Sequence, residues 1–391
     1  MSGKLIAARR AIVETAEGTR ILAPAAVRVE GGRVVEVHEG EPSGDPDVIL
    51  EDGYLAPGLI DLQVNGYFGV DFVDAGPDEW ERVVRRMPET GVTAFAPTFI
   101  TAPVPALADA LRTTAALLPQ LTGGARVLGV HVEGPFLSAE QQGAHNEQWL
   151  ADPEPGSLEK LLDAGGGSLA LLTLAPERPG AMEAIRRADA AGVCVSIGHS
   201  DATADQVHAA ADAGARMVTH LFNAQRGLHH REPGVVGRGL TDQRLACGLI
   251  ADLHHVYAEA CVVAFRAAPG RICLVTDALA AAGMAPGRYV LGGEPVVLPF
   301  EGPAARDDGT IAGSALRLDL AIANMVGLGI DVLTAVDAAT RVPAGTIGRP
   351  DLGRIAAGAA ADLVWLGDDL RTRATWVAGE CAYRGSLEMS G

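Results

Sequence analysis

Apolar runs rich in β-branched residues alternate with alanine-rich, helix-like segments through the middle of this 391-residue chain. The runs occupy residues 59–64, 93–99, 127–133, 169–174, 193–198, 217–221, 245–251 and 272–276, and the pattern predicts helices over 78–90, 104–118, 181–191, 204–213 and 258–267. Continuous apolar runs of this kind are typical of parallel strands that are buried on both faces. Eight of them in β-α order predict an α/β protein, a (β/α)8 TIM-like barrel.

An open, doubly wound sheet is the competing topology for the same order of elements. Polar residues follow many of the eight runs, at the point where each predicted strand ends. A barrel collects its active site at the carboxyl ends of its strands, so this distribution favours the barrel.

The two ends of the chain have a different pattern from the middle. The first fifty and the last forty residues are short strand-like segments separated by glycine- and proline-rich turns. We therefore predict a small β-sandwich domain built from both chain termini, residues 1–56 and 346–391. The barrel would then occupy residues 57–345.

The composition supports a large core and limits the possible partners. Hydrophobic residues make up 48% of the chain but aromatic residues only 4%, so aliphatic side chains must fill the core. The net charge is −18, from 31 basic and 49 acidic residues. Such a surface repels nucleic acid and anionic membranes, so we expect neither as a partner. An anionic substrate would need positive charge placed locally in its site.

The cysteines and the N-terminal residues indicate a cytoplasmic protein. There are five cysteines at wide spacings, and no C-x-x-C motif occurs. That count argues against a disulfide framework or a zinc ribbon and fits a reducing compartment. The N-terminus lacks the apolar segment of a signal peptide, and no apolar run reaches the length of a membrane span.

One carboxylate and two imidazoles follow three of the predicted strands. They are Glu133, His199 and His220. A lone histidine at a strand end is more often a hydrogen-bonded structural residue, and a lone glutamate is usually solvated. Three protein ligands with one open position are the pattern of hydrolytic zinc sites, so their coincidence at strand ends indicates a catalytic metal.

Asp277 follows the last predicted strand and allows two interpretations. It could cap the next helix. In a metal hydrolase, a carboxylate at this place can instead take a proton from the attacking water and later give it to the leaving nitrogen.

The chain resembles the N-acetylglucosamine-6-phosphate deacetylases of the amidohydrolase superfamily. The resemblance runs from residues 56–61 (APGLID) to 361–364 (ADLV), nearly the whole chain. Its most specific parts are residues 129–136 (GVHVEGPF), 143–146 (GAHN), 198–200 (GHS), 219–224 (THLFNA), 231–234 (REPG), 250–252 (IAD), 274–278 (LVTDA) and 311–314 (IAGS). Each motif is short, but together and in this order they make a specific match.

The resemblance implies a role for each matching position. The implied metal ligands are Glu133, His199 and His220, the catalytic acid/base is Asp277, and His145 lies beside the scissile carbonyl. The implied substrate-binding positions are Ala144, Asn223, Ala224, Arg231, Asp252, His255, Ile311, Ala312 and Gly313. The guanidinium of Arg231 suits a phosphate, although by itself it would be read as a surface arginine. Of the adjacent His254 and His255, only one is expected to point into the site.

The chain also departs from the superfamily at informative positions. Many amidohydrolases carry His-x-His on the first strand, where it helps to hold a second metal, but this chain has Gln63 and Asn65. Neutral amides are weak ligands for a transition metal. We therefore expect one divalent metal per subunit, Zn²⁺ with Fe²⁺ as the alternative. Gln225 replaces the methionine that is usual beside the phosphate-binding loop.

The expected activity is metal-dependent removal of the acetyl group from N-acetylglucosamine 6-phosphate, which gives glucosamine 6-phosphate and acetate. The alternatives are the same reaction on the galactose epimer, another amidohydrolase reaction, or an inactive barrel that acts as a binding protein. A bridging carboxylated lysine is excluded, because Lys4 and Lys160 are the only lysines and neither ends a predicted barrel strand. The resemblance also implies a homodimer in which a loop carrying Arg231 reaches the phosphate site of the other subunit.

Overall fold

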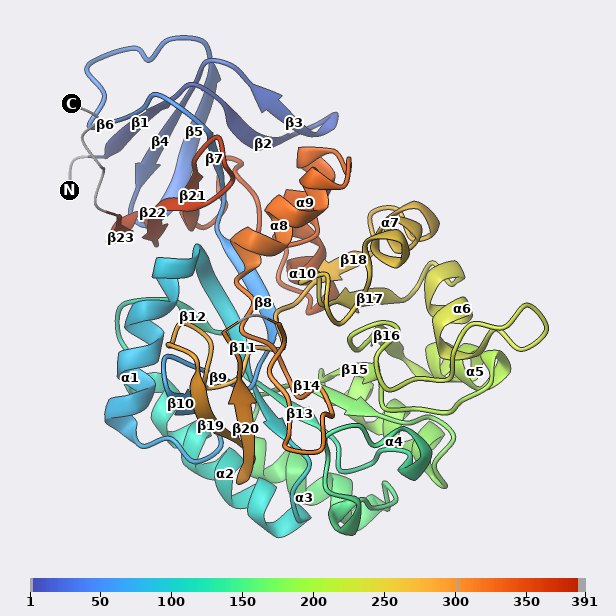
Figure 1. Cartoon of the computed structure of the whole chain (residues 1–391). Helices are drawn as coiled ribbons and strands as arrows, with labels where there is room; N and C mark the ends of the chain where they lie inside the picture. Colours follow the sequence, from blue (N-terminus) through green and yellow to red (C-terminus); the bar gives the residue numbers. More distant parts are fainter. Residues whose placement is uncertain (1–2, 301, 386–391) are drawn as a thin grey trace.

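A computed structural model describes residues 3–300 and 302–385 of the chain. The described chain forms a large barrel and, at one end of it, a smaller part made of two β-sheets (Figure 1). Residues from both ends of the chain build this smaller part. None of the helices in the described ranges is both long and apolar enough to cross a membrane.

Eight parallel strands form the barrel, as the hydrophobic pattern predicts. In spatial order they are β8 (Leu59–Val64), β11 (Val92–Ile100), β13 (Val130–Glu133), β14 (Leu169–Leu174), β15 (Cys194–Ile197), β16 (Ala215–Val218), β17 (Ala246–Leu249) and β18 (Ile272–Leu274). The last strand comes back to the first: the N–H of Asp277 donates to the carbonyl of Gln63 at 2.9 Å, and Val64 bridges Ala278 in parallel. The barrel is therefore nearly closed, and the prediction of a (β/α)8 fold is confirmed.

The helices pack around this barrel, and half of them were predicted. The predicted helices are α1 (Pro77–Arg86), α2 (Val104–Leu117), α4 (Ala181–Ala190), α5 (Ala204–Ala213) and α7 (Ala258–Ala267). The structure adds α3 (Pro155–Gly165), α6 (Gly234–Thr241), α8 (Leu318–Gly327), α9 (Val332–Asp337) and α10 (Arg341–Thr346). Helix α6 contains three glycines, which disfavour a helix locally. It forms because most of its residues are buried against the barrel, so tertiary packing overrides the local preference.

The smaller part consists of a four-stranded and a six-stranded sheet around one apolar core. The first sheet contains β5 (Arg33–Glu39), β4 (Ala25–Glu30), β1 (Lys4–Ala8) and β6 (Val48–Leu50). The second contains β23 (Glu380–Arg384), β22 (Thr372–Val377), β21 (Leu363–Leu366), β7 (Tyr54–Pro57), β2 (Ala11–Thr15) and β3 (Gly18–Leu22). Ile12, Leu55 and Trp376 are buried in or beside this core, so the two chain ends stabilise each other. The sequence boundaries of the two domains remain a prediction.

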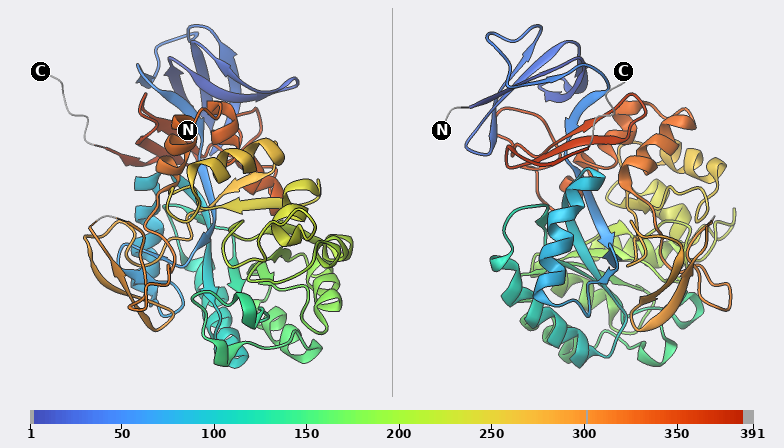
Figure 2. Two further views of the ribbon diagram at one scale, coloured as in Figure 1. Left: turned by 45° about the vertical axis from the view of Figure 1, so that its right-hand side comes forward. Right: turned by 60° about the vertical axis from the view of Figure 1, so that its left-hand side comes forward.

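One hairpin stands outside both parts and was not predicted. Strands β19 (Gly287–Leu291) and β20 (Glu294–Leu298) pair with each other, Val297 of β20 also bridges Ala305, and the hairpin forms a small apolar cluster with Leu279, Ala304 and Ala312. In both views of Figure 2 the hairpin lies against the barrel, away from the two sheets at the top. The remaining short strands are β9 (Gly66–Tyr67), β10 (Val70–Asp71) and β12 (Arg126–Val127).

Candidate active site

The candidate catalytic side chains stand at the carboxyl ends of four barrel strands. Glu133 is the last residue of β13, and His199, His220 and Asp277 follow β15, β16 and β18. The three residues that follow strands have positive φ angles of 47°, 27° and 50°. Residues other than glycine rarely adopt this conformation, and it persists only where the surroundings impose it. Such strain, gathered at one end of a barrel, is typical of a functional site.

The atoms of Glu133, His199 and His220 converge on one point. Nε2 of His220 lies 3.0 Å from Oε1 of Glu133 and 3.0 Å from Nε2 of His199, and Nε2 of His199 lies 3.3 Å from the same oxygen. Ligand atoms bound to one tetrahedral zinc at about 2.0–2.1 Å lie roughly 3.3–3.4 Å apart. One separation matches this value and two are about 0.3 Å shorter, so the three atoms lie close to the spacing of a single ion.

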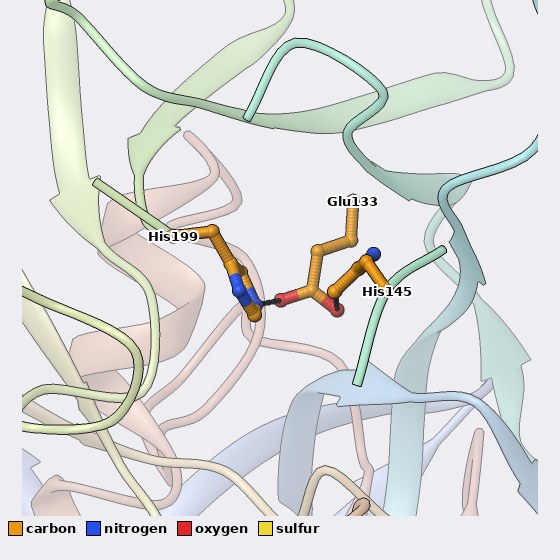
Figure 3. Close-up of side chains that lie close together, drawn as sticks. All are labelled: Glu133, His145 and His199. Carbon is orange, nitrogen blue, oxygen red and sulfur yellow. Dashed lines mark ion pairs between the residues drawn. The ribbon is translucent and has the colours of Figure 1, made fainter. Parts of the chain in front are cut away.

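His145 is a fourth member of this cluster. It brings a ring nitrogen to within 4.8 Å of candidate ligand atoms of Glu133 and His199, and Figure 3 shows these three side chains facing one another. Nε2 of His145 lies 3.9 Å from Oε2 of Glu133. Glu133, His199 and His145 form a second possible ligand set, in which His145 replaces His220, but these atoms are farther apart. The tighter triangle with His220 fits one ion better.

Hydrogen bonds fix which ring nitrogens face the cluster. Nδ1 of His199 donates to the carbonyl of Gln141 at 3.0 Å, which leaves Nε2 as a free ligand atom. The backbone N–H of Thr101 donates to Nδ1 of His145 at 3.3 Å. The hydroxyl of Thr101 lies 2.8 Å from the same Nδ1, so Thr101 holds this side of the ring and Nε2 faces the cluster. Burial and then repulsion by His199 lower the pKa of His145 to about 3, so this ring is neutral.

Two amide side chains hold the carboxylates of this site. Nδ2 of Asn65 donates to Oδ1 of Asp277 at 2.7 Å, and Nε2 of Gln63 donates to the same oxygen at 3.2 Å and to Oε1 of Glu133 at 3.1 Å. Burial and then the negative charge of Glu133 raise the pKa of Asp277 to about 6. Glu133 differs: burial raises its pKa, but the contacts with His199 and His220 outweigh burial and hold the pKa well below its ordinary value. The two carboxylates therefore differ in basicity, as separate roles require.

A cavity of about 160 Å³ joins these residues to most of the predicted substrate positions. The predicted residues that line it are Glu133, Ala144, His145, His199, His220, Asn223, Ala224, His255, Asp277, Ile311, Ala312 and Gly313. Asp252 lies behind the wall: its Oδ2 accepts a hydrogen bond from Nδ1 of His255 at 2.6 Å and so orients that ring. His254 is exposed, and only His255 faces the cavity.

Arg231 is not brought to the cavity of its own chain. It is exposed in the loop before α6, where it contacts Nε2 of His230 at 2.8 Å. Neither lysine nor arginine occurs among the described residues that line the cavity. The site within one chain therefore holds neutral donors for an anion but no permanent cation.

Gln225 braces the loop in which it replaces the expected methionine. Its Nε2 donates to the carbonyl of Thr219 at 2.6 Å, and its Oε1 accepts from the N–H of Phe222 at 3.3 Å. These bonds span a turn in which Phe222 and Ala224 have positive φ angles. The buried Gln225 side chain therefore stabilises this loop by hydrogen bonds to its backbone.

Sequence reasoning missed two apolar residues that line the cavity, Ile100 and Leu291. Ile100 ends β11, and Leu291 lies at the tip of the β19–β20 hairpin. The hairpin has a signal in the sequence: alternating residues flank Gly292 and Gly293, a pair typical of tight hairpin turns. Nothing in that pattern indicates that its tip reaches the site.

A larger cavity, of about 690 Å³, lies at the opposite end of the barrel, beside the amino ends of β15–β17. Its arginines are already engaged: Arg216 pairs with Asp189 at 2.7 Å, and Arg271 donates to four backbone carbonyls around the end of α6. Polar groups at this end of a barrel are usually structural. The smaller cavity, with its strained and paired titratable residues, is the candidate active site.

Comparisons with known proteins agree with this choice. Residues 54–382 match the amidohydrolase family. The chain is 40% identical over 330 residues to N-acetylgalactosamine-6-phosphate deacetylase of Escherichia coli O157:H7, covering 84% of this chain and 87% of that protein. It is 38% identical over 351 residues to N-acetylglucosamine-6-phosphate deacetylase of Vibrio furnissii, covering 89% and 88%.

The fold has equally close counterparts among solved structures. One is N-acetyl-D-glucosamine-6-phosphate deacetylase from Mycobacterium smegmatis, a mutant in complex with N-acetyl-D-glucosamine-6-phosphate. It has 34% sequence identity and a TM-score of 0.92, and the match covers 98% of this chain and 100% of that one. The same overall fold thus surrounds a site for that sugar phosphate in a relative.

Proposed function

The chain belongs to the amidohydrolase family, and from that premise we propose that it hydrolyses the acetamide of N-acetylglucosamine 6-phosphate to glucosamine 6-phosphate and acetate. The observation that carries this proposal is the single cavity in which a carboxylate–imidazole cluster, Asp277 and the neutral donors of the β16 and β17 loops meet. The reaction is a step of amino sugar metabolism, and the enzyme is a hydrolase acting on a linear amide.

We propose that Glu133, His199 and His220 hold one divalent ion per subunit, Zn²⁺ with Fe²⁺ as the alternative. A carboxylate and two imidazoles are the donor set of hydrolytic zinc, and the three atoms lie close to the spacing of a tetrahedral site. Nδ1 of His220 is buried without a hydrogen-bond partner among the described residues, so the polar contacts of this ring are those of Nε2 with Glu133 and His199. When bound, the ion supplies a Lewis acid that polarises the amide carbonyl and makes a water molecule more acidic.

Asp277 is proposed to move the proton. Its Oδ1 accepts from Asn65 and Gln63, whereas no described side chain donates to Oδ2. Oδ2 therefore takes a proton from the attacking water as the oxygen bonds to the acyl carbon. Asp277 then delivers that proton to the sugar nitrogen while the C–N bond breaks, which leaves acetate and the free amine.

His145 is proposed to stabilise the negative charge that develops on the carbonyl oxygen during the reaction. Its ring is neutral and brings Nε2 toward the cluster, and because Nδ1 accepts from the N–H of Thr101 we assign the ring proton to Nε2, where it donates to the oxygen as negative charge develops. A donor that is already in place costs no reorganisation when the charge appears. Asn223, Ala224 and His255 are proposed to bind the phosphate at the other end of the cavity, with Asp252 orienting His255 and residues 311–313 contacting the sugar.

The missing cation of the phosphate site leads us to propose a homodimer. A phosphate dianion is bound best by a guanidinium, and the cavity of one chain offers none. Arg231 is exposed on a projecting loop and is free to enter the cavity of a second copy. Each active site would then be completed by the other subunit.

A complementation experiment tests this dimer. Arg231→Ala alone is expected to raise KM for the sugar phosphate at least ~10-fold with a small change in kcat, because it removes a binding contact. Arg231→Ala chains are then co-expressed with Asp277→Asn chains. In a mixed dimer, the active site of the Arg231→Ala chain keeps its own Asp277 and receives Arg231 from the Asp277→Asn chain, so we expect this site to have the wild-type KM. If the mixed dimers keep the raised KM of Arg231→Ala, Arg231 acts within its own chain and the proposed exchange between subunits is wrong.

Acetate release tests the proposed activity itself. N-acetylglucosamine 6-phosphate, its galactose epimer and unphosphorylated N-acetylglucosamine are compared on one preparation whose metal content is measured. We expect release from the first sugar at least ~10²-fold above the unphosphorylated one, because charge-assisted phosphate contacts are lost there. Preference for the epimer would favour the second candidate, which the 40% identity to the Escherichia coli relative raises. No release from any of the three would refute both.

A further inference from the structure

The active-site cavity has a second cavity beside it. This neighbour has a volume of about 540 Å³ and lies between the start of α2, Trp149 and the tip of the β19–β20 hairpin. Ile100 lines both cavities. The side chain of Ile100 and the hairpin tip are therefore the partition between them.

The partition is tightly built. A Cβ atom placed on Gly292 would come within 2.4 Å of Cδ1 of Ile100, and the φ angle of +55° at this position favours glycine, so a larger residue would strain the turn and displace Ile100. Oδ2 of Asp71, at the end of β10, accepts a hydrogen bond from the N–H of Gly292 at 2.9 Å and anchors the tip. Leu291, the preceding residue, is buried and faces the active-site cavity.

The geometry of the proposed substrate directs its acyl group toward this partition. In a glucosamine ring, C2 carries the acylamino group and C5 carries the phosphorylated carbon, and these ring atoms lie opposite each other. The proposed phosphate-binding residues follow β16 and β17. Strands β11 and β16 are the second and sixth of eight in spatial order, so they lie across the barrel from each other. A sugar held by its phosphate at β16 therefore extends its acyl group toward β11, which ends at Ile100.

The neighbouring residues place the acyl carbon in the same direction. Thr101, next to Ile100 in the chain, holds His145, whose Nε2 is assigned to the carbonyl oxygen. The carbonyl oxygen thus lies toward the cluster and the nitrogen toward Asp277. The remaining substituent of the carbonyl carbon, the acyl chain, lies toward the apolar side chains of Ile100 and Leu291, which pack with the hairpin cluster.

We propose that Ile100, backed by Leu291 and Gly292, sets the length of the acyl group that this enzyme removes. The inference rests on the proposed function and deepens it, because it concerns which N-acylated sugars are substrates. The methyl of an acetyl group ends at the partition, and a longer chain meets it. Beyond the partition the second cavity is lined by Ala106, Leu107 and Trp149, which would receive a longer chain, and also by Asp74 and Asp109.

The variant Ile100→Ala tests the partition. The measured quantity is the ratio of kcat/KM for N-butyryl- to N-acetylglucosamine 6-phosphate, with the N-propionyl sugar in between. The reaction balances as for acetate: the C–N bond breaks, water adds its oxygen to the acyl carbon, and the amine and the corresponding carboxylate leave. One extra methylene against a fitted apolar wall typically costs roughly 10–200-fold. We expect a wild-type ratio below ~0.01 and an increase of at least ~10-fold in Ile100→Ala.

A second readout separates binding from turnover. The Asp277→Asn variant is expected to turn over too slowly to consume the sugar during a titration. Calorimetry on this variant therefore gives the affinities for the N-acetyl and N-butyryl sugars. Adding Ile100→Ala is expected to shift the affinity ratio toward the butyryl sugar by a similar factor. Ile49→Ala, the same change at an exposed site in β6, is the matched control and is expected to leave both ratios unchanged.

The outcomes distinguish this inference from the proposed function. Normal acetate release with an unchanged ratio in Ile100→Ala would overturn the partition alone. Absence of acetate release from the wild-type enzyme, with neither sugar bound, would overturn both. If Ile100→Ala does not fold, Ile100→Val removes one methyl group, and its propionyl-to-acetyl ratio must rise for the inference to stand.

Discussion

Asp277→Asn lowers kcat at least ~10²-fold while the metal content stays at the wild-type level. The amide cannot accept a proton from water or return one to the sugar nitrogen, and loss of a general acid/base costs about this much. Asparagine has nearly the same shape and keeps an oxygen for Asn65 and Gln63 to donate to, so the packing around it is preserved. The measurements are steady-state kinetics and metal analysis on the same preparation.

The pH profile of the wild-type enzyme should carry the signature of Asp277. Its raised pKa, about 6, means that the carboxyl is neutral below that pH and cannot act as a base. kcat/KM should therefore fall as the pH drops, with the acid limb at or below about pH 6, because positive charge at the neighbouring cluster favours the ionised form. Asp163→Asn, a surface change on α3, is the matched control. Near-normal turnover of Asp277→Asn would remove this residue from the mechanism.

His220→Ala loses the metal, whereas His145→Ala keeps it. This pair of variants decides between the two candidate ligand sets, which share Glu133 and His199. If Glu133, His199 and His220 hold the ion, His220→Ala should purify with less than ~0.1 metal per chain. Its kcat/KM should fall at least ~10²-fold, because loss of a ligand costs more than the 10–100-fold loss typical of residues that support a ligand. Metal analysis by mass spectrometry is the measurement.

The expectation for His145→Ala follows from its different role. Removal of an oxyanion donor costs about 10²–10³-fold in kcat and leaves ligands in place, so metal near one per chain should accompany slow turnover. His254→Ala, an exposed histidine beside the site, should change neither quantity. The reverse pattern, with metal lost in His145→Ala and retained in His220→Ala, would assign the ion to the other set.

The barrel strands and the polar residues at their carboxyl ends could be predicted from the sequence. Burial on both faces leaves continuous apolar runs, and these runs matched the strands closely: β8 and β14 have the predicted bounds. Side chains alternate along a strand, so Gln63 and Asn65, two residues apart, point to the same side and both donate to Asp277. Patterns of this kind are local, and a linear sequence displays them directly.

Other features depend on contacts between distant segments. Helix α6, with three glycines, has poor local propensity and is stabilised by burial against the barrel. The sequence of the β19–β20 hairpin predicts its turn. It does not predict that the backbone of Gly292 packs closely against the side chain of Ile100. No residue pattern reports such an approach, because the two segments are almost two hundred residues apart.

The fold class, the joining of the two chain ends in one β part and the kinds of residue at the strand ends follow from local patterns in the chain. Which of those residues share a cavity follows from the folded structure: it places His255 on the wall with Asp252 behind it, and it leaves Arg231 outside. The difference arises because strand and helix periodicity is a property of neighbours in the chain. The distance from Glu133 to His199 or His220 is instead set by how eight strands close around one axis, which no single segment encodes.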